Sequence, residues 1–470
     1  MRRAWIKLVV VAGVMASLQA GVRGVDADPP QWRGGAAAIE HLGSRLPAVA
    51  AANGLSTASL RSHLLTDASL RIDTDDRLLY VDPARVAASS PATSWLDGTG
   101  NTTATFTEHS KPGSARTIYL DFGGRTISGT AWNTSVVGES CYTDAYDADG
   151  VAGFSSEELK SIYSIWQRVA EDYAPFDVDV TLAEPSPAAI VRSNSADTVY
   201  GTRVLITKST TKCTTGKTFY EAICSSGCGG VAYVGVFDWY RSTTSPDSYY
   251  QPALVFQNGT GAGAKFVAEA VSHEAGHNLG LSHDGASSTG YYGGHGSWAP
   301  IMGVGYYKAI TQWSKGEYAG ANNTQDDFAV MGQNGAGPRA DETSISLVVG
   351  SQVSGVISSA ADVDSFTIAL TKGQKVTIAA APASTSPDLD IKLTASIKVK
   401  RSSLVVSDDP PSGSTSGDTS MGMGATLTLT AASSGTYTVK VEGVGYGDRL
   451  TTGYSDYASV GGYTISVTSG

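Results

Sequence analysis

The sequence predicts an α+β protein that consists of a mixed α/β unit followed by an all-β sandwich. Strand and helix patterns interleave between residues 111 and 335, a succession typical of a mixed α/β layer. After residue 335 the helical period disappears, and short alternating runs between Gly, Ser and Pro turns indicate a β-sandwich. The chain has 470 residues, enough for about three folding units, and its 41% apolar content excludes disorder for most of it.

Several elements of the first unit follow from local patterns. Residues 117–122 alternate as a strand, and Ser155 with Glu158 forms a capping box that opens a helix. Apolar residues recur along that helix at spacings of three and four, which predicts one buried face. Further strands are expected at 177–182, 203–207, 229–237 and 253–257, and a second helix at 264–279.

Residues 336–470 form the predicted sandwich. A Gly/Ser/Pro-rich stretch at 407–424 is expected to be a flexible loop within it. Seven β runs are expected, at 345–348, 365–370, 375–380, 390–393, 426–429, 436–441 and 463–467.

The N-terminus has the features of an export signal. Arg2, Arg3 and Lys7 precede an apolar stretch at 8–18, which is too short to span a bilayer, and small residues follow it. We therefore expect a signal peptide at 1–24 and a secreted, extracellular protein; a buried N-terminal helix is the alternative. Residues 25–110 contain no cysteine and end in a Ser/Thr/Gly/Asn-rich linker at 88–105.

Charge and cysteine content narrow the possible partners. The formal net charge of -11 argues against nucleic acid and anionic membrane surfaces, which require a basic footprint. An even number of cysteines in an exported chain predicts disulfides, and four cysteines allow three pairings. Alternatively, Cys224 and Cys228 could form half of a metal knuckle. The four cysteines are Cys141, Cys213, Cys224 and Cys228.

The segment SHEAGHNLGLSHD, at 272–284, carries the most informative chemistry. His273 and His277 are four residues apart, so on a helix both imidazoles project from one face. Gly280 permits the positive φ that lets the chain turn back and bring His283 to the same ion. Glu274 can hold a water at the metal without ligating it. Three nitrogen ligands plus solvent is the arrangement of catalytic zinc, so the segment predicts a catalytic zinc site. The alternative interpretation is that these are surface histidines on an amphipathic helix.

This segment resembles the extended zinc signature of metzincin metallopeptidases, and Asp284 matches the reprolysin-like (adamalysin-type) branch. WAPIMG, at 298–303, is similar to the Met-turn of that clan, which makes Met302 the matching residue. The surrounding block is similar to that of secreted bacterial reprolysin-like proteins. A Tyr ligand, which some metzincins place two residues after the Met, is replaced here by Val304, so Tyr306 and Tyr307 are doubtful ligands.

The resemblance covers about residues 115–332 and implies a mainly parallel twisted sheet, an active-site helix and an edge strand that binds extended substrate at 231–237. It divides the chain into a propeptide with linker at 25–110, a zinc peptidase domain at 111–335 and a C-terminal domain at 336–470. The C-terminal domain resembles the bacterial pre-peptidase C-terminal sandwich through DVDSFTIAL and GTYTVKVEG. A cysteine-switch latency mechanism has no candidate residue in the propeptide.

The resulting hypothesis is a secreted zinc endopeptidase that is made as a precursor and acts on protein or peptide substrates. We expect a monomer with no membrane span. His273, His277 and His283 are the expected ligands of one Zn²⁺, and Glu274 is the general base. The alternative is an extracellular binding protein on an inactive metzincin scaffold, with the C-terminal sandwich as the binding module.

Weaker signals concern the substrate cleft and a second metal. Val231, Tyr233, His295 and Tyr306 are candidate cleft residues, although His295 also fits a solvent-exposed loop. Asp147 and Asp149 could contribute to a structural calcium site, but the spacing fails that of an EF-hand, and a solvated turn is the alternative. Asp362 and Asp364 allow the same two interpretations.

Overall fold

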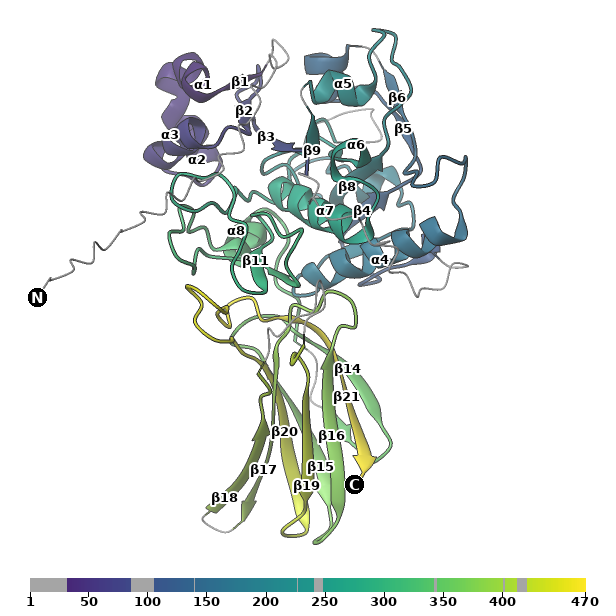
Figure 1. Cartoon of the computed structure of the whole chain (residues 1–470), viewed down its shortest axis with the longest axis vertical. Helices are drawn as coiled ribbons and strands as arrows, with labels where there is room; N and C mark the ends of the chain where they lie inside the picture. Colours follow the sequence, from purple (N-terminus) through teal and green to yellow (C-terminus); the bar gives the residue numbers. More distant parts are fainter. Residues whose placement is uncertain are drawn as a thin grey trace, which may run out of the picture.

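The computed structural model describes residues 32–85, 105–138, 140–225, 227–240, 248–341, 345–399, 402–411 and 421–470. The expected signal peptide and nearly all of the expected linker lie outside these residues. Figure 1 shows an upper lobe that contains the described α-helices and a lower lobe built from long strands. The predicted class, a mixed α/β unit plus a β-sandwich, is confirmed.

An eight-stranded sheet organises the upper lobe, in the order β1-β2-β3-β9-β10-β8-β4-β7. Within residues 111–335, β4 pairs in parallel with β7 and β8, and β8 pairs in parallel with β10. Only β9 is antiparallel to its neighbour β10 there, so this part of the sheet is mainly parallel, as expected. These strands are β4 (Arg116–Asp121), β7 (Asp179–Thr181), β8 (Tyr200–Thr207), β9 (Cys228–Tyr233) and β10 (Ala253–Phe256).

Two long helices cover one face of this sheet. Helix α4 (Ser156–Asp172) begins with the predicted capping box, in which Ser155 and Glu158 satisfy each other's backbone N–H groups. Its apolar stripe, including Ile162 and Ile165, is fully buried against the sheet and helix α7 (Ala264–Asn278). Because α7 is buried on every side, its orientation relative to the strands is fixed by packing.

The opposite face of the sheet has its own apolar core, which includes Trp132, Tyr233 and Phe256. Helix α5 (Phe219–Ile223) and the hairpin of β5 (Arg125–Ile127) with β6 (Cys141–Thr143) lie on this side. Disulfides join Cys141 to Cys213 and Cys224 to Cys228, which selects one of the three pairings. The metal-knuckle interpretation is therefore wrong, because both of its sulfurs are bonded to each other.

The N-terminal unit (32–85) extends the same sheet. Strands β1 (Arg33–Gly34), β2 (Leu70–Ile72) and β3 (Leu78–Pro83) follow one another antiparallel, and β3 pairs antiparallel with β9. Three short helices pack against them through a small core, which Figure 1 shows as the purple cluster at the upper left. The helices are α1 (Gly35–Leu42), α2 (Leu46–Ala52) and α3 (Thr57–Thr66).

Short elements complete the upper lobe around helix α7. Strands β11 (Trp298–Pro300) and β12 (Ile310–Gln312) pair in parallel. Helix α6 (Gln257–Thr260) precedes α7, and helix α8 (Asp327–Gln333) leads toward the lower lobe. No helix in the described part of the chain combines the length and apolar character that crossing a membrane requires.

The lower lobe is a sandwich of a five-stranded sheet and a four-stranded sheet, with orders β13-β15-β20-β17-β18 and β14-β21-β16-β19. All seven β runs expected from the sequence overlap a strand, whereas β14 and β18 were not predicted. The strands are β13 (Ser346–Leu347), β14 (Gln352–Ile357), β15 (Val363–Leu370), β16 (Lys375–Pro382), β17 (Ile391–Val399), β18 (Ser402–Asp408), β19 (Ala425–Thr430), β20 (Gly435–Gly443) and β21 (Gly461–Ser469).

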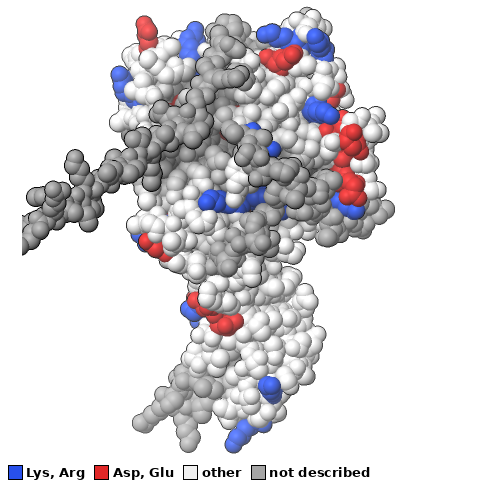
Figure 2. Space-filling model, in the orientation of Figure 1, with Lys and Arg blue, Asp and Glu red and all other residues white. Residues whose placement is uncertain are grey.

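The two lobes meet beneath α4, where Gly462 at the start of β21 donates its backbone N–H to the carboxylate of Glu171 at 3.2 Å. Phe328 of α8 packs on Tyr457 of the lower lobe. In Figure 2 the described surface is mostly uncharged, and the charged side chains are scattered singly or in small groups. This view agrees with the low charged fraction of the chain, 16%.

Candidate metal centre

Helix α7 presents two histidines on one face, one turn apart. His273 and His277 are both buried, and their ring centroids lie 4.8 Å apart. The i, i+4 spacing places both rings on the same side of helix α7, which packs against strand β9. Their position therefore follows from the packing of α7 rather than from flexible surface side chains.

A glycine turn returns the chain to the same place. Gly280 has φ +96°, and a Cβ there would lie 2.6 Å from Nδ2 of Asn334, so the position requires glycine. The backbone N–H of Leu281 donates to the carbonyl of Gly276 at 3.0 Å and closes the end of the helix. His283 then approaches His277, with their Nε2 atoms 3.1 Å apart.

The other ring nitrogen of each histidine is already bound. Nδ1 of His273 is 2.8 Å from the carbonyl oxygen of Ile301, and Nδ1 of His277 is 2.8 Å from that of Leu281. A carbonyl oxygen only accepts, so both Nδ1 atoms carry the proton, and a neutral ring then has a lone pair on Nε2. Nδ1 of His283 faces the carboxylate of Asp67 at 2.6 Å, with the same consequence.

The residues fit a bound cation. The Nε2 atoms of His277 and His283 lie 3.1 Å apart, close enough for one cation to bind both when each ring is neutral. Nε2 of His273 and Oε2 of Glu274 are buried and have no hydrogen-bond partner among the described residues. Unpaired buried polar atoms are costly, and imidazole nitrogens are common zinc ligands. A divalent ion held by His273, His277 and His283 would give the His273 nitrogen a partner.

Met302 lies directly beneath the helix at this point. A Cβ on Gly276 would come within 2.7 Å of the Met302 sulfur, so the helix can approach the methionine only because position 276 is glycine. Met302 is fully buried, and its carbonyl accepts the backbone N–H of Asp284 at 2.8 Å. The segment that contains Met302 thus supports the loop that carries His283.

Glu274 points from α7 to the underside of strand β9. A Cβ on Gly230 would lie 1.9 Å from its Oε1 atom, so the carboxylate occupies the space that a side chain at 230 would fill. Burial, and then the nearby charge of Asp82, raise the pKa of Glu274 well above its usual range. Glu274 therefore binds a proton readily.

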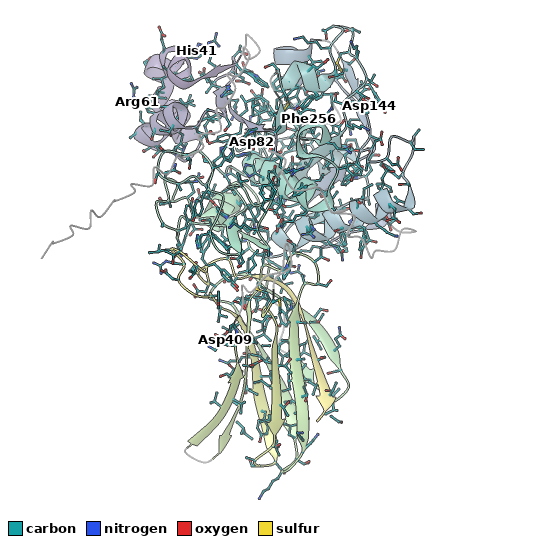
Figure 3. All side chains as sticks on the ribbon, viewed as in Figure 1. His41, Arg61, Asp82, Asp144, Phe256 and Asp409 are labelled. Atoms are coloured by element: carbon teal, nitrogen blue, oxygen red, sulfur yellow. A yellow bond between two sulfur atoms is a disulfide. The ribbon has the colours of Figure 1, made fainter. Side chains whose placement is uncertain are left out.

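A carboxylate from the N-terminal unit meets all three histidines. Oδ2 of Asp82, on strand β3, lies 3.0 Å from Nε2 of His273 and 3.5 Å from Nε2 of His277. Its Oδ1 lies 3.1 Å from Nε2 of His283 and accepts the hydroxyl of Tyr291 at 2.9 Å. Figure 3 labels Asp82 in the middle of the upper lobe, beside the N-terminal helices. The sequence analysis did not identify this residue.

The N-terminal unit makes further contacts with the same histidines. His283 donates its Nδ1 proton to Asp67. In addition, the ring of Tyr80 stacks on His277 with centroids 4.3 Å apart and lies 4.0 Å from the His283 ring. Burial disfavours charge on His283, but Asp67 and Asp82 outweigh it and raise its pKa to about 10. Burial lowers the pKa of His277 to about 4.

The candidate cleft residues have different surroundings. Val231 and Tyr233 direct their side chains into the core on the far face of the sheet, because alternate residues of β9 face opposite sides. Only the backbone groups of these two residues can therefore pair with a strand beside β9. Tyr306 lines a small cavity with His273 and Glu274. His295 lies elsewhere: its Nε2 donates to the carbonyl of Gly453 at 2.7 Å and its Nδ1 accepts from Tyr292.

The calcium expectation has no support. Carboxylate oxygens of Asp147, Asp149 and Glu158 lie within 4.8 Å of one another. Asp147 accepts the backbone N–H of Gly150 at 2.6 Å and Glu158 accepts that of Ser155 at 2.8 Å, so these oxygens are engaged in organising the turn before α4. A second acidic group comprises Asp341, Asp362 and Asp364, and it is partly exposed.

The fold and the site together define a metallopeptidase-like α/β unit that is joined to a β-sandwich. Residues 159–284 match the family model described as Metallo-peptidase family M12B Reprolysin-like. The matched segment runs from α4 through the third histidine, and it supports a zinc metallopeptidase at the level of the family. No curated protein matches the chain in sequence.

Among solved structures, the chain resembles the pre-peptidase C-terminal domain of a collagenase from Bacillus anthracis (12% identity, 28% of this chain and 98% of that chain, TM-score 0.18). It also resembles Aeromonas hydrophila PliG, a periplasmic lysozyme inhibitor of g-type lysozyme (12% identity, 27% and 95%, TM-score 0.18). A third is CorA, a surface-associated copper-binding protein of Methylomicrobium album BG8 (10% identity, 28% and 99%, TM-score 0.18). At these TM-scores the likenesses carry no functional argument.

Proposed function

We propose that the protein is a secreted zinc endopeptidase with His273, His277 and His283 as metal ligands and Glu274 as general base. The observation that carries the proposal is the convergence of three buried imidazole Nε2 atoms beside a buried carboxylate that has an unpaired oxygen. A binding protein would gain nothing from leaving such atoms without partners, because each is costly when buried. The match to a metallopeptidase family model supports the same assignment.

The proposed mechanism assigns one task to each residue. Zinc, when bound, supplies a Lewis acid that polarises the scissile carbonyl and lowers the pKa of water to about 7. Glu274 accepts the proton of the attacking water and then delivers it to the leaving amine. The carbonyls of Ile301 and Leu281 hold the Nδ1 protons of His273 and His277, so that their Nε2 atoms would face the metal.

Strand β9 is the proposed binding edge for the substrate. Its outer edge already accepts a strand, since β3 pairs with it antiparallel with Val81 opposite Val231. An extended peptide that replaces β3 would form the same backbone hydrogen bonds and would bring one of its peptide groups close to the histidines. This edge therefore favours extended, unfolded segments of proteins as substrates.

Export and precursor status belong to the same proposal. The cationic start and the short apolar stretch at 8–18 predict a secretory signal, and the two disulfides suit an oxidising compartment. The N-terminal unit is proposed to be a propeptide, because it covers the edge strand on which substrate would bind.

Metal removal tests the proposed function directly. The processed chain should contain about one zinc per molecule, and it should cleave casein. Treatment with 1,10-phenanthroline should reduce cleavage at least about 100-fold, and added Zn²⁺ should restore it, since the chain has no other proposed Lewis acid. Elemental analysis and the cleavage rate are the measurements. Stoichiometric zinc with no hydrolysis of any protein or peptide would favour the binding-protein alternative.

Gly230→Ala tests whether the position of Glu274 matters. The new methyl group would overlap the Glu274 carboxylate and displace it, so kcat/KM should fall about 100-fold, while zinc content stays unchanged. Gly229→Ala is the matched control. The nearest atom to a Cβ at position 229 would be the carbonyl oxygen of Pro83, at 3.2 Å, and Pro83 belongs to the N-terminal unit. Equal activities of the two variants would contradict the assigned role of Glu274.

A further inference from the structure

We infer that Asp82 is the fourth metal ligand in the unprocessed chain, so that the N-terminal unit keeps the enzyme latent through a carboxylate. The inference rests on the proposed zinc site. It goes beyond that site because it assigns a ligand, a closed coordination state and a mode of regulation to a segment that the zinc motif does not include.

The first argument is the spacing of the ligand atoms. Four atoms that lie about 2.0–2.1 Å from a tetrahedral zinc ion are about 3.3 Å from one another. The Asp82 oxygens lie 3.0, 3.5 and 3.1 Å from the Nε2 atoms of the three histidines, and one pair of these nitrogens is 3.1 Å apart. Because Oδ2 faces His273 and His277 whereas Oδ1 faces His283, the carboxylate lies against all three histidines at distances that one tetrahedral ion can bridge.

The second argument is the state of the Asp82 oxygen that faces His273. This Oδ2 atom is buried and has no hydrogen-bond partner among the described residues, although it lies 3.0 Å from His273 Nε2. The two atoms lie close enough for one ion to bind both. The other oxygen is fixed by the hydroxyl of Tyr291.

The third argument is the way in which the N-terminal unit holds Asp82 in place. Asp82 lies opposite Gly230 in the β3–β9 pairing, and the register shifts directly after it, at Pro83. Two residues further on, the guanidinium of Arg85 lies 3.9 Å from the Phe266 ring and donates to the carbonyl of Thr260 at 3.0 Å. The carboxylate is thus held between a paired strand and an anchored arginine.

The consequence for reactivity follows from coordination number. Catalytic zinc has three protein ligands and an open position, whereas four protein ligands close the site. With Asp82 in place no position is left for solvent, and β3 covers the edge that would bind substrate. Removal of the N-terminal unit opens both at once. The Asp82 carboxylate would thereby block the metal in place of the thiolate of a cysteine switch, since the segment 25–110 contains no cysteine.

Cobalt spectroscopy on the full chain tests this inference without measuring catalysis. Three chains would be compared in a Glu274→Gln background, which prevents self-cleavage: the parent, Asp82→Ala, and the control Asp75→Ala, which removes an exposed carboxylate of the same unit. After loading with one equivalent of Co²⁺, acetohydroxamate should change the visible spectrum of Asp82→Ala alone. Its apparent affinity there should be at least about 10-fold tighter than in the parent and the control.

The outcomes separate the two levels of the proposal. Equal hydroxamate binding by all three chains would overturn the role of Asp82 while leaving the zinc site intact. If His277→Ala bound Co²⁺ with the parent's spectrum, the proposed metal site itself would be wrong. Asp82→Asn, which preserves the shape of the side chain and one acceptor oxygen, serves as a second variant if Asp82→Ala does not fold, and it should weaken zinc retention against a chelator.

Discussion

Glu274→Gln should reduce kcat/KM of the processed enzyme by about 10²- to 10⁴-fold, the contribution of a positioned general base. An amide of the same size cannot accept the proton of the attacking water. The substitution does not touch the three imidazoles, and the Nδ1 atoms of His273 and His277 stay held by the carbonyls of Ile301 and Leu281, which remain in the processed chain. Zinc content should therefore stay at about one per chain. Peptide hydrolysis and elemental analysis of the same preparation provide the two measurements.

A matched control comes from the same helix. Glu269 is also buried, but its carboxylate pairs with Lys265 at 2.9 Å and accepts from Thr311 at 3.2 Å, so it has partners independent of the metal. Glu269→Gln should cost far less activity than Glu274→Gln. If both variants lost activity equally, or if Glu274→Gln also lost its zinc, the loss would reflect structure, and the general-base role would be refuted.

The same electrostatics link catalysis to the state of the N-terminal unit. Burial raises the pKa of Glu274 most strongly, and the charge of Asp82 raises it further. Departure of Asp82 removes a neighbouring negative charge, so the pKa of Glu274 falls and the carboxylate becomes available as a base. One movement would thus free the coordination position, uncover strand β9 and lower the pKa of the base.

Local patterns in the sequence predicted much of the fold. The capping box at Ser155 is present, and the helix expected at 264–279 is observed as Ala264–Asn278. Seven β runs in the C-terminal part correspond to strands. These signals are local, because capping, helical periodicity and alternation each depend on residues a few positions apart. Strand β14 was missed because its exposed and buried residues alternate weakly, with glycine in the middle.

Contacts between distant segments could not be predicted in the same way. Asp67 lies 216 residues from His283, and no spacing rule relates a carboxylate in one unit to an imidazole in another. The pairing of β3 with β9 and the two disulfides depend equally on tertiary folding. The available signal for Asp82 was an aspartate at the end of an apolar strand, in YVDP, within a segment that lacks cysteine.

The contact between the lobes predicts a loss of stability as pH rises. Glu171, near the end of α4, is buried against the N–H of Gly462, and a Cβ on Gly461 would lie 2.1 Å from its Oε1. Burial raises the pKa of Glu171 to about 8, and burial followed by the charge of Glu269 raises that of Asp172 to about 7. In the unfolded chain both groups titrate near pH 4, so the folded protein binds more protons between about pH 4 and pH 8.

Since the folded state holds these protons, stability is greatest below the unfolded pKa and is lost as pH rises through the folded pKa, by on the order of a few kcal/mol. Glu171→Gln should keep the hydrogen bond from Gly462 without titrating, so its Tm should fall less between pH 5 and pH 8 than that of the parent. The control is Glu157→Gln, an exposed carboxylate on the same helix. Thermal unfolding of all three chains, each carrying Glu274→Gln, is the measurement. Because the metal site is the same in each chain, an identical pH slope for Glu171→Gln and the parent would show that Glu171 is already ionised at neutral pH.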